Sequence, residues 1–215
     1  MSTVARAPSG KLVLEDISWQ EYTRLLKVFD ERPAIRLTYD HGTLELMTIS
    51  FKHERYGEFI GRLVATLTEE LGLPIMGGGS TTFRRYAKRR GLEPDNCYWI
   101  PSESKVRGKF KIDLREDPPP DLAIEIDISR SSMSRMSIYA SIGVPEVWRF
   151  DGRTLSFHRL QPDETYEIVP ESGVFPGLRP NDLVQFLQQP KREEENAVIR
   201  QFRSWIRSRV AAGWR

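Results

Sequence analysis

Cysteine and histidine are scarce in this chain, and their scarcity excludes several kinds of site. The single cysteine, Cys97, cannot form an intramolecular disulfide, and no cysteine spacing suits a structural zinc site. Three histidines, His41, His53 and His158, and the absence of a Gly-x-Ser-x-Gly motif give little support to a nucleophilic triad. We therefore expect Cys97 to be a small core residue, in a chain suited to a reducing cytoplasm.

The chain also lacks long hydrophobic runs and a large net charge. No segment approaches the roughly 18 apolar residues of a membrane span, and residues 1–10 lack the apolar stretch of a signal peptide. No membrane partner is therefore expected. With 32 Lys and Arg against 30 Asp and Glu, the net charge is +2, which argues against a polycation that coats nucleic acid.

The 215 residues fit one main domain with a sizeable core. We expect a flexible leader over residues 1–14, a main domain over 15–189 and a charged helical tail over 190–215 that packs weakly on the body or on a partner. Hydrophobic periodicity predicts helices near 18–32, 53–71, 131–143 and 182–187, hairpins over 35–47 and 147–158, and strands over 73–85, 93–100, 118–128 and 166–169. This mixture predicts an α/β (α+β) fold with a central mixed sheet flanked by helices.

Residues 118–128 have an unusual pattern for a strand. Side chains alternate between the two faces of a strand. One face carries Leu122, Ile124, Ile126 and Ile128, and the other carries Asp121, Ala123, Glu125 and Asp127. Like charges on one strand face repel, so a cation beside this face would stabilise it. A divalent metal with oxygen ligands is one interpretation, and a solvated face of an amphipathic strand is the other.

A basic run follows the predicted strand over 73–85. It contains Arg84, Arg85, Lys88, Arg89 and Arg90, with Tyr86 among them. Such runs are usually solvated loops. Beside a nuclease-like site, this one is predicted to contact phosphates.

Several short motifs resemble one family. They are Leu92-Glu-Pro-Asp95, the stretch 118–129, Tyr139-Ala-Ser-Ile-Gly-Val-Pro-Glu-Val-Trp148, Thr43-Leu-Glu-Leu-Met47 followed by His53-Glu54, and Phe175-Pro-Gly-Leu178. Over residues 15–187 the chain is similar to the Uma2 family, also called the DUF820 group, and Glu125-Ile-Asp-Ile128 resembles its cyanobacterial branch. That family is similar to the PD-(D/E)xK nuclease superfamily, which implies a restriction-endonuclease-like core with an N-terminal helix and hairpin.

The resemblance also implies a site. It assigns a Mg²⁺ or Mn²⁺ ion to Asp95 and Glu125, with Asp121 or Asp127 completing a second ion site or orienting water. The superfamily lysine is absent, because Asp127 stands in its usual place. In many relatives the lysine has moved to the following helix, where this chain has Arg135. His53 and Glu45 border the implied site.

The implied activity is metal-dependent hydrolysis of phosphodiester bonds in DNA. Arginine stays protonated, so Arg135 can bind phosphate but cannot act as a base. The alternative is a catalytically inactive nuclease-fold protein that binds nucleic acid or a protein partner. Expected partners are DNA and, where the chain self-associates, a second copy in a homodimer. Glu125→Gln is expected to abolish cleavage and to leave stability unchanged or improved, because it relieves a repulsive carboxylate cluster.

Overall fold

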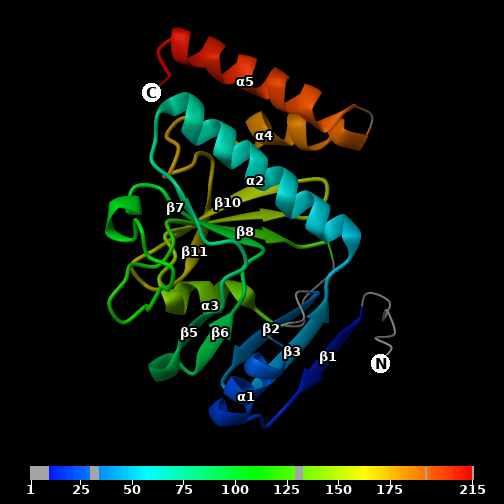
Figure 1. Cartoon of the computed structure of the whole chain (residues 1–215), viewed down its shortest axis with the longest axis vertical. Coiled ribbons are helices and arrows are strands. Elements are labelled where there is room, and N and C mark those ends of the chain that lie inside the picture. The colour runs from blue at the N-terminus through cyan, green and yellow to red at the C-terminus, as the bar shows by residue number, and fades with distance from the viewer. Residues whose placement is uncertain (1–9, 30–33, 129–132, 192, 215) are drawn as a thin grey trace.

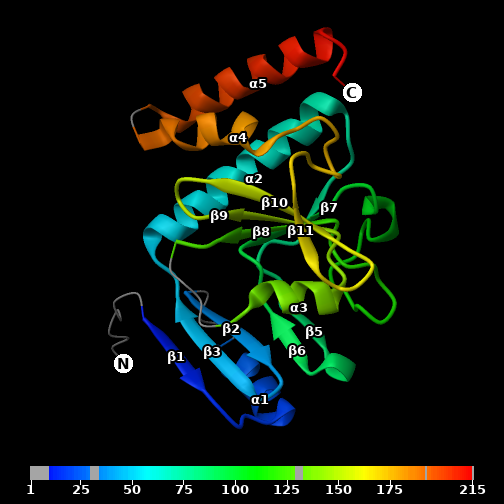
Figure 2. The same cartoon turned by 180° about the vertical axis from the view of Figure 1, so that it is seen from behind.

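The described part of the chain forms two β-sheets and five α-helices arranged in layers. A computed structural model describes residues 10–29, 34–128, 133–191 and 193–214. Figures 1 and 2 show the order of the layers along the long axis, with α5, α4 and α2 at one end, then the larger sheet, then α3, and the smaller sheet with α1 at the other end. The predicted mixed sheet flanked by helices is confirmed.

The smaller sheet is antiparallel and grows from the N-terminal hairpin. Its strands, in spatial order, are β1 (Lys11–Leu14), β3 (Thr43–Thr48), β2 (Ile35–Asp40), β6 (Arg90–Leu92) and β5 (Phe83–Arg85). Helix α1 (Trp19–Phe29) packs on it around the buried side chains of Tyr22, Leu37, Tyr39 and Leu44. The predicted hairpin over 35–47 is therefore confirmed as β2 and β3.

The larger sheet is mixed and carries the acidic strand at its centre. Its strands, in spatial order, are β11 (Tyr166–Val169), β10 (Leu155–Leu160), β9 (Glu146–Phe150), β8 (Leu122–Ile126), β7 (Asn96–Trp99) and β4 (Met76–Gly77). Strands β8 and β9 are parallel and are joined through α3 (Arg135–Ile142). Every residue of β8 is buried, so the solvated-face interpretation of this strand is wrong.

Helices cover both faces of the larger sheet. On one face, α2 (Phe51–Leu71), α4 (Pro180–Leu187) and α5 (Glu195–Ala211) enclose the main hydrophobic core with Ile124, Trp148 and Phe157. On the other face, α3 encloses a second core that contains Cys97 and Ala123. None of the helices in the described ranges is both long enough and apolar enough to cross a membrane.

Helix α2 is capped at both ends by residues typical of helix termini, Ser50 at the start and Gly72 at the end. The Ser50 side chain accepts a hydrogen bond from the His53 backbone N–H at 3.3 Å, which satisfies one free amide of the first turn. Gly72 ends the helix in the left-handed conformation, with φ of 65°. This cap fixes the position of His53 at the start of the helix.

Sequence expectations about three short segments differ from the structure or lie partly outside its described residues. Residues 11–14, expected in the leader, form β1 and pair with β3; residues 1–9 lie outside the described part. The strand predicted over 73–85, interrupted at the glycines 77–79, is two strands in different sheets, because β4 pairs with β7 and β5 pairs with β6. The helix start predicted at 131–134 falls partly outside the described residues, and α3 begins at Arg135.

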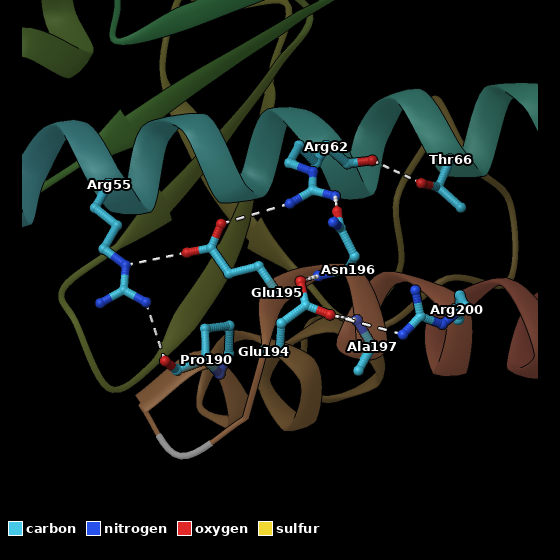
Figure 3. Close-up of polar contacts among 9 residues, drawn as sticks. All are labelled: Arg55, Arg62, Thr66, Pro190, Glu194, Glu195, Asn196, Ala197 and Arg200. Carbon is cyan, nitrogen blue, oxygen red and sulfur yellow. Dashed lines mark hydrogen bonds and ion pairs between the residues drawn. The ribbon is translucent and has the colours of Figure 1, made fainter.

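The tail does not pack weakly. Helix α5 buries Val198, Ile199, Phe202 and Ile206 in the main core. Figure 3 shows its first turn against α2, where Glu195 accepts from Arg55 Nε at 3.1 Å and from Arg62 Nη1 at 3.4 Å. Because its apolar face is continuous with the core, the charged tail is part of the same folded body.

Candidate active site

The two carboxylates implied by the motifs lie on adjacent segments of the larger sheet. Strands β7 and β8 are antiparallel with Asn96 opposite Ile124, which sets Asp95 beside Glu125. The Asp95 backbone N–H donates to the Ile124 carbonyl at 3.2 Å, and the Ile126 N–H donates to Asp95 Oδ2 at 2.6 Å. The backbone of β8 therefore fixes the Asp95 carboxylate next to Glu125.

Glu125 is buried, and both of its oxygens have partners. Arg135 Nε lies 2.5 Å from Oε1, and the Tyr139 hydroxyl donates to Oε2 at 2.7 Å. Arg135 also donates from Nη1 to Thr38 Oγ1 at 2.9 Å and from Nη2 to the Glu93 carbonyl at 2.6 Å. The start of α3 is thereby attached to both sheets.

The electrostatics of this cluster follow from burial and close charges. Burial raises the pKa of Glu125, Arg135 opposes this rise, and Asp95 adds to it. Burial acts to lower the pKa of Arg135, but Glu125 raises it above its ordinary value, so the guanidinium stays charged. The site is a buried acid pair whose charge is offset by one permanent cation.

His53 lies in the first turn of α2 and faces Asp95. Its Nε2 is 3.3 Å from Asp95 Oδ2, but the direction is poor for a hydrogen bond, and this buried nitrogen has no hydrogen-bond partner in the described residues. Burial lowers the pKa of His53, yet the Asp95 and Glu125 carboxylates raise it overall. His53 thus lies against the acid pair without a hydrogen bond from Nε2 to Asp95.

A hollow of about 270 Å³ opens onto this cluster. It is lined by Glu125, Asp127, Met133, Ser134, Arg135, Met136 and Arg149. Arg149 stands opposite Glu125 on the neighbouring parallel strand and forms an ion pair with Asp127. The Arg149 side chain is 36% exposed, so its guanidinium is accessible from the hollow.

Sequence reasoning missed Arg149, Tyr139 as a polar group, Thr38 and Glu93. The Glu125–Arg149 pairing depends on the parallel register of β8 and β9, which the residue pattern does not specify. Thr38 belongs to the hairpin, where alternation suggests a solvent-facing position, yet it is buried against α3. Glu45, expected at the border of the site, is buried opposite Thr38 on β3.

Asp121 is not brought to the acid pair. Its Oδ2 accepts from the Ile100 N–H at 2.7 Å, from the Ser102 N–H at 2.9 Å and from Ser102 Oγ at 2.8 Å. It precedes Glu125 by four residues, which is about 13 Å along a strand. Neither an ion on the acid pair nor a second ion about 4 Å from it reaches that far, so Asp121 lies outside the site, contrary to the sequence expectation.

The residues of the basic run differ in whether they form ion pairs and in how exposed they are. Lys88 forms an ion pair with Glu164 at 3.2 Å, and Arg90 forms one with Asp40 at 2.7 Å. Arg89 is exposed and has a left-handed backbone with φ of 46°. Arg84 and Arg85 lie on β5, so any phosphate contact of the run rests mainly on these two and Arg89.

Comparison with known proteins identifies a family and a similar solved structure. No curated protein matches the chain. A similar solved structure is described as that of "a putative nuclease belonging to DUF820" from Anabaena variabilis. It is 17% identical, the match covers 70% of this chain and 90% of that one, and the TM-score is 0.46. The family described as "Uma2: Putative restriction endonuclease" matches residues 19–190, well over half of the sequence. The chain therefore belongs to the Uma2 family.

Proposed function

We propose that this protein is a Mg²⁺- or Mn²⁺-dependent endonuclease that hydrolyses phosphodiester bonds in DNA, with its centre at Asp95 and Glu125. The supporting observation is the burial of two adjacent carboxylates on neighbouring segments of one sheet. Burying like charges side by side is costly, and a protein that only binds a partner gains nothing from it. Membership of a restriction-endonuclease family supports the same reaction.

The residues present fit a hard divalent ion. Among the described residues, no three His, Cys, Asp or Glu side chains converge as a complete ligand set. Mg²⁺ usually keeps several waters and binds through one or two carboxylates, so Asp95 and Glu125 suffice as protein ligands. The unpartnered Nε2 of His53 beside Asp95 marks a buried polar position that is incomplete in the protein alone.

A bound ion would supply a water of lowered pKa and would polarise the phosphoryl oxygen. The other tasks fall to the protein. Arg149, accessible in the hollow, binds the scissile phosphate, and Asp127 orients its guanidinium. Arg135 offsets the negative charge that develops at phosphorus, without taking up a proton. His53 lies beside Asp95 and, when protonated, offsets the negative charge of the acid pair.

A second candidate function is nucleic-acid binding without cleavage. It is favoured by the contacts of Glu125, since Arg135 and Tyr139 already engage both of its oxygens. In this case Arg135 takes the place of an ion, and the acid pair has only a structural role.

Cleavage of supercoiled plasmid with Mg²⁺ or Mn²⁺, and with EDTA instead, tests the proposal. We expect metal-dependent nicking that falls by at least about 100-fold in Asp95→Asn and in Glu125→Gln, each checked for folding by circular dichroism. Glu167→Gln, a carboxylate exposed on β11, is the matched control and should cleave normally. If the folded parent does not cleave with either metal but binds DNA in a salt-sensitive way, the second candidate is correct.

A further inference from the structure

A second, larger hollow lies away from the acid pair. It has a volume of about 660 Å³ and lies between α1, β5 and the segment that precedes β8. Its lining includes Trp19 from α1 and Lys111 from the segment before β8. Arg84 and Arg85 come from β5, and Tyr86 from the short helical turn that follows β5. None of them belongs to the site proposed for cleavage.

Three cations of this hollow have no direct ionic partner in the described residues. The acidic residue of its lining, Asp113, pairs with Arg115 and lies near Lys111. The side chains of Arg84, Arg85 and Lys111 make no hydrogen bond or ion pair within the described part of the chain, and the Nε of Arg85 is buried without a partner. By contrast, Lys88 and Arg90 of the same basic run are paired. A buried, unpaired guanidinium nitrogen is costly, so this surface is suited to an anionic ligand.

An exposed aromatic ring stands among these cations. The Tyr86 side chain is 72% exposed, and its ring lies 5.7 Å from that of Trp19 at an angle of 74°. Trp19 is itself held by edge contacts with Tyr22 and Tyr39. Tyr86 therefore rests on a fixed support and leaves most of its surface open to a planar ligand.

We propose that this hollow binds an unpaired nucleotide of a nucleic-acid strand, with the base stacked on Tyr86 and the phosphates at Arg84, Arg85 and Lys111. Cations alone would suit an acidic peptide equally well. An exposed ring among unpaired cations is the combination that binds single strands, because each base has a face to stack and each phosphate has a charge. The proposal rests on the proposed nuclease function only in naming unpaired DNA as the substrate class.

The hollow has a neighbour that extends toward a contact of the proposed site. A neighbouring hollow of about 410 Å³ shares Thr23, Thr82 and Arg84 with it and extends to Glu93. The Glu93 carbonyl accepts the hydrogen bond from Arg135 that was described above. A strand held at Tyr86 therefore lies next to a hollow whose lining residue Glu93 contacts Arg135 of the proposed site.

Fluorescence anisotropy with a labelled 15-residue oligothymidylate, in EDTA so that no cleavage occurs, tests the proposal. Tyr86→Ala should raise Kd by about 5-fold to 100-fold, the range expected for one stacked base, and Tyr86→Phe should bind as the parent does. Arg84→Gln should reduce the slope of log K against log salt by about 0.7, the loss of one phosphate contact. Phe51→Ala removes an aromatic ring that is 77% exposed on another surface and should leave Kd unchanged.

Three results would overturn the proposal. An unchanged Kd in folded Tyr86→Ala would exclude stacking. Equal affinity for a blunt hairpin duplex, again independent of Tyr86, would indicate a surface that contacts phosphates only. Competition by polyglutamate that depends on Tyr86 would indicate an acidic protein partner. Because no metal is present, these results are independent of whether the protein cleaves DNA.

Discussion

Arg135 is a single side chain that joins three parts of the fold. It contacts Glu125 on β8, Thr38 on β2 and the carbonyl of Glu93, which follows β6. A guanidinium removed from water depends on such partners, because an uncompensated buried charge is strongly destabilising. The ion pair with Glu125 is therefore a structural link between the sheets as well as part of the proposed site.

The geometry changes the stability expected for Glu125→Gln. Sequence reasoning expects neutral or improved stability, since one of two repulsive carboxylates is removed. In the structure, the substitution leaves Arg135 without the carboxylate that lies 2.5 Å from its Nε. We expect the free energy of unfolding to fall by about 3 kcal/mol, measured by urea denaturation.

A double variant provides the control for this prediction. Glu125→Gln combined with Arg135→Met removes both charges, and it should recover part of the loss if the unpaired guanidinium is its cause. A Glu125→Gln midpoint equal to or above that of the parent would show that Arg135 finds other partners, and would restore the original expectation.

At the scale of elements, two sequence motifs turn out to be one structural unit. Glu146 is buried at the start of β9, and its Oε1 accepts from Trp148 Nε1 and from Ser172 Oγ, both at 2.6 Å. Its Oε2 accepts from the Gly173 N–H at 2.6 Å. The Gly-Val-Pro-Glu-x-Trp motif thus holds the segment that leads into Phe175-Pro-Gly-Leu178, which explains a pattern without evident chemistry.

Removing this carboxylate should loosen the segment after β11. In Glu146→Ala the donors of Trp148, Ser172 and Gly173 lose their acceptor in a buried place, so we expect a loss of about 3 kcal/mol in urea denaturation. Glu167→Ala on exposed β11 is the matched control and should change stability by about 0.5 kcal/mol or less. Equal effects of the two variants would show that Glu146 is not a structural anchor.

Elements with local signals could be predicted from the sequence, and those with distant partners could not. Both hairpins and α2 carry their turns, caps and periodicity within a short window. Strands β5 and β6 are three residues each, and their assignment to the smaller sheet depends on pairing with β2, about fifty residues earlier. The position of Arg149 opposite Glu125 could not be predicted for the same reason, because it depends on the parallel register of two strands that α3 separates in the sequence.

The candidate acid pair was accessible to sequence reasoning for a different reason. Asp95 and Glu125 stand in motifs that resemble a family, and the alternation of the acidic strand indicated an unusual face. The same alternation gave no way to separate Asp121, which binds backbone amides of a turn, from Glu125. Distance along the strand, rather than residue type, makes that distinction.

At the scale of the whole molecule, α5 completes the core although it lies beyond the region matched by the family. Its ion pairs with α2 include Arg203 with Glu70 at 2.6 Å and Arg207 with Glu70 at 2.7 Å. Phe186 of α4 packs edge-on against Phe202 with the ring centres 4.9 Å apart. The family region and this helix therefore share one hydrophobic core.

Deletion of residues 190–215 should leave the rest of the chain largely unfolded. Burial of the four apolar side chains of α5 contributes about 1.5–3 kcal/mol each to the free energy of unfolding. Their sum is comparable to the whole free energy of unfolding of a typical protein, about 5–15 kcal/mol. Soluble yield and circular dichroism measure the effect. Arg200→Ala, which removes an exposed ion pair of α5 with Glu194 at 3.6 Å, is the control and should be nearly neutral. A truncated chain with the parent's midpoint would contradict the prediction.

The position of α5 has a consequence during protein synthesis. Helix α2 ends at Leu71 and α5 begins at Glu195, so at about 5–20 residues per second the ribosome needs roughly 6–25 s to pass from one to the other. Throughout that interval the apolar surface that α5 will cover stays open on the nascent chain. Chaperones that bind apolar segments have this period in which to act, and folding of the domain finishes only when its last helix has emerged.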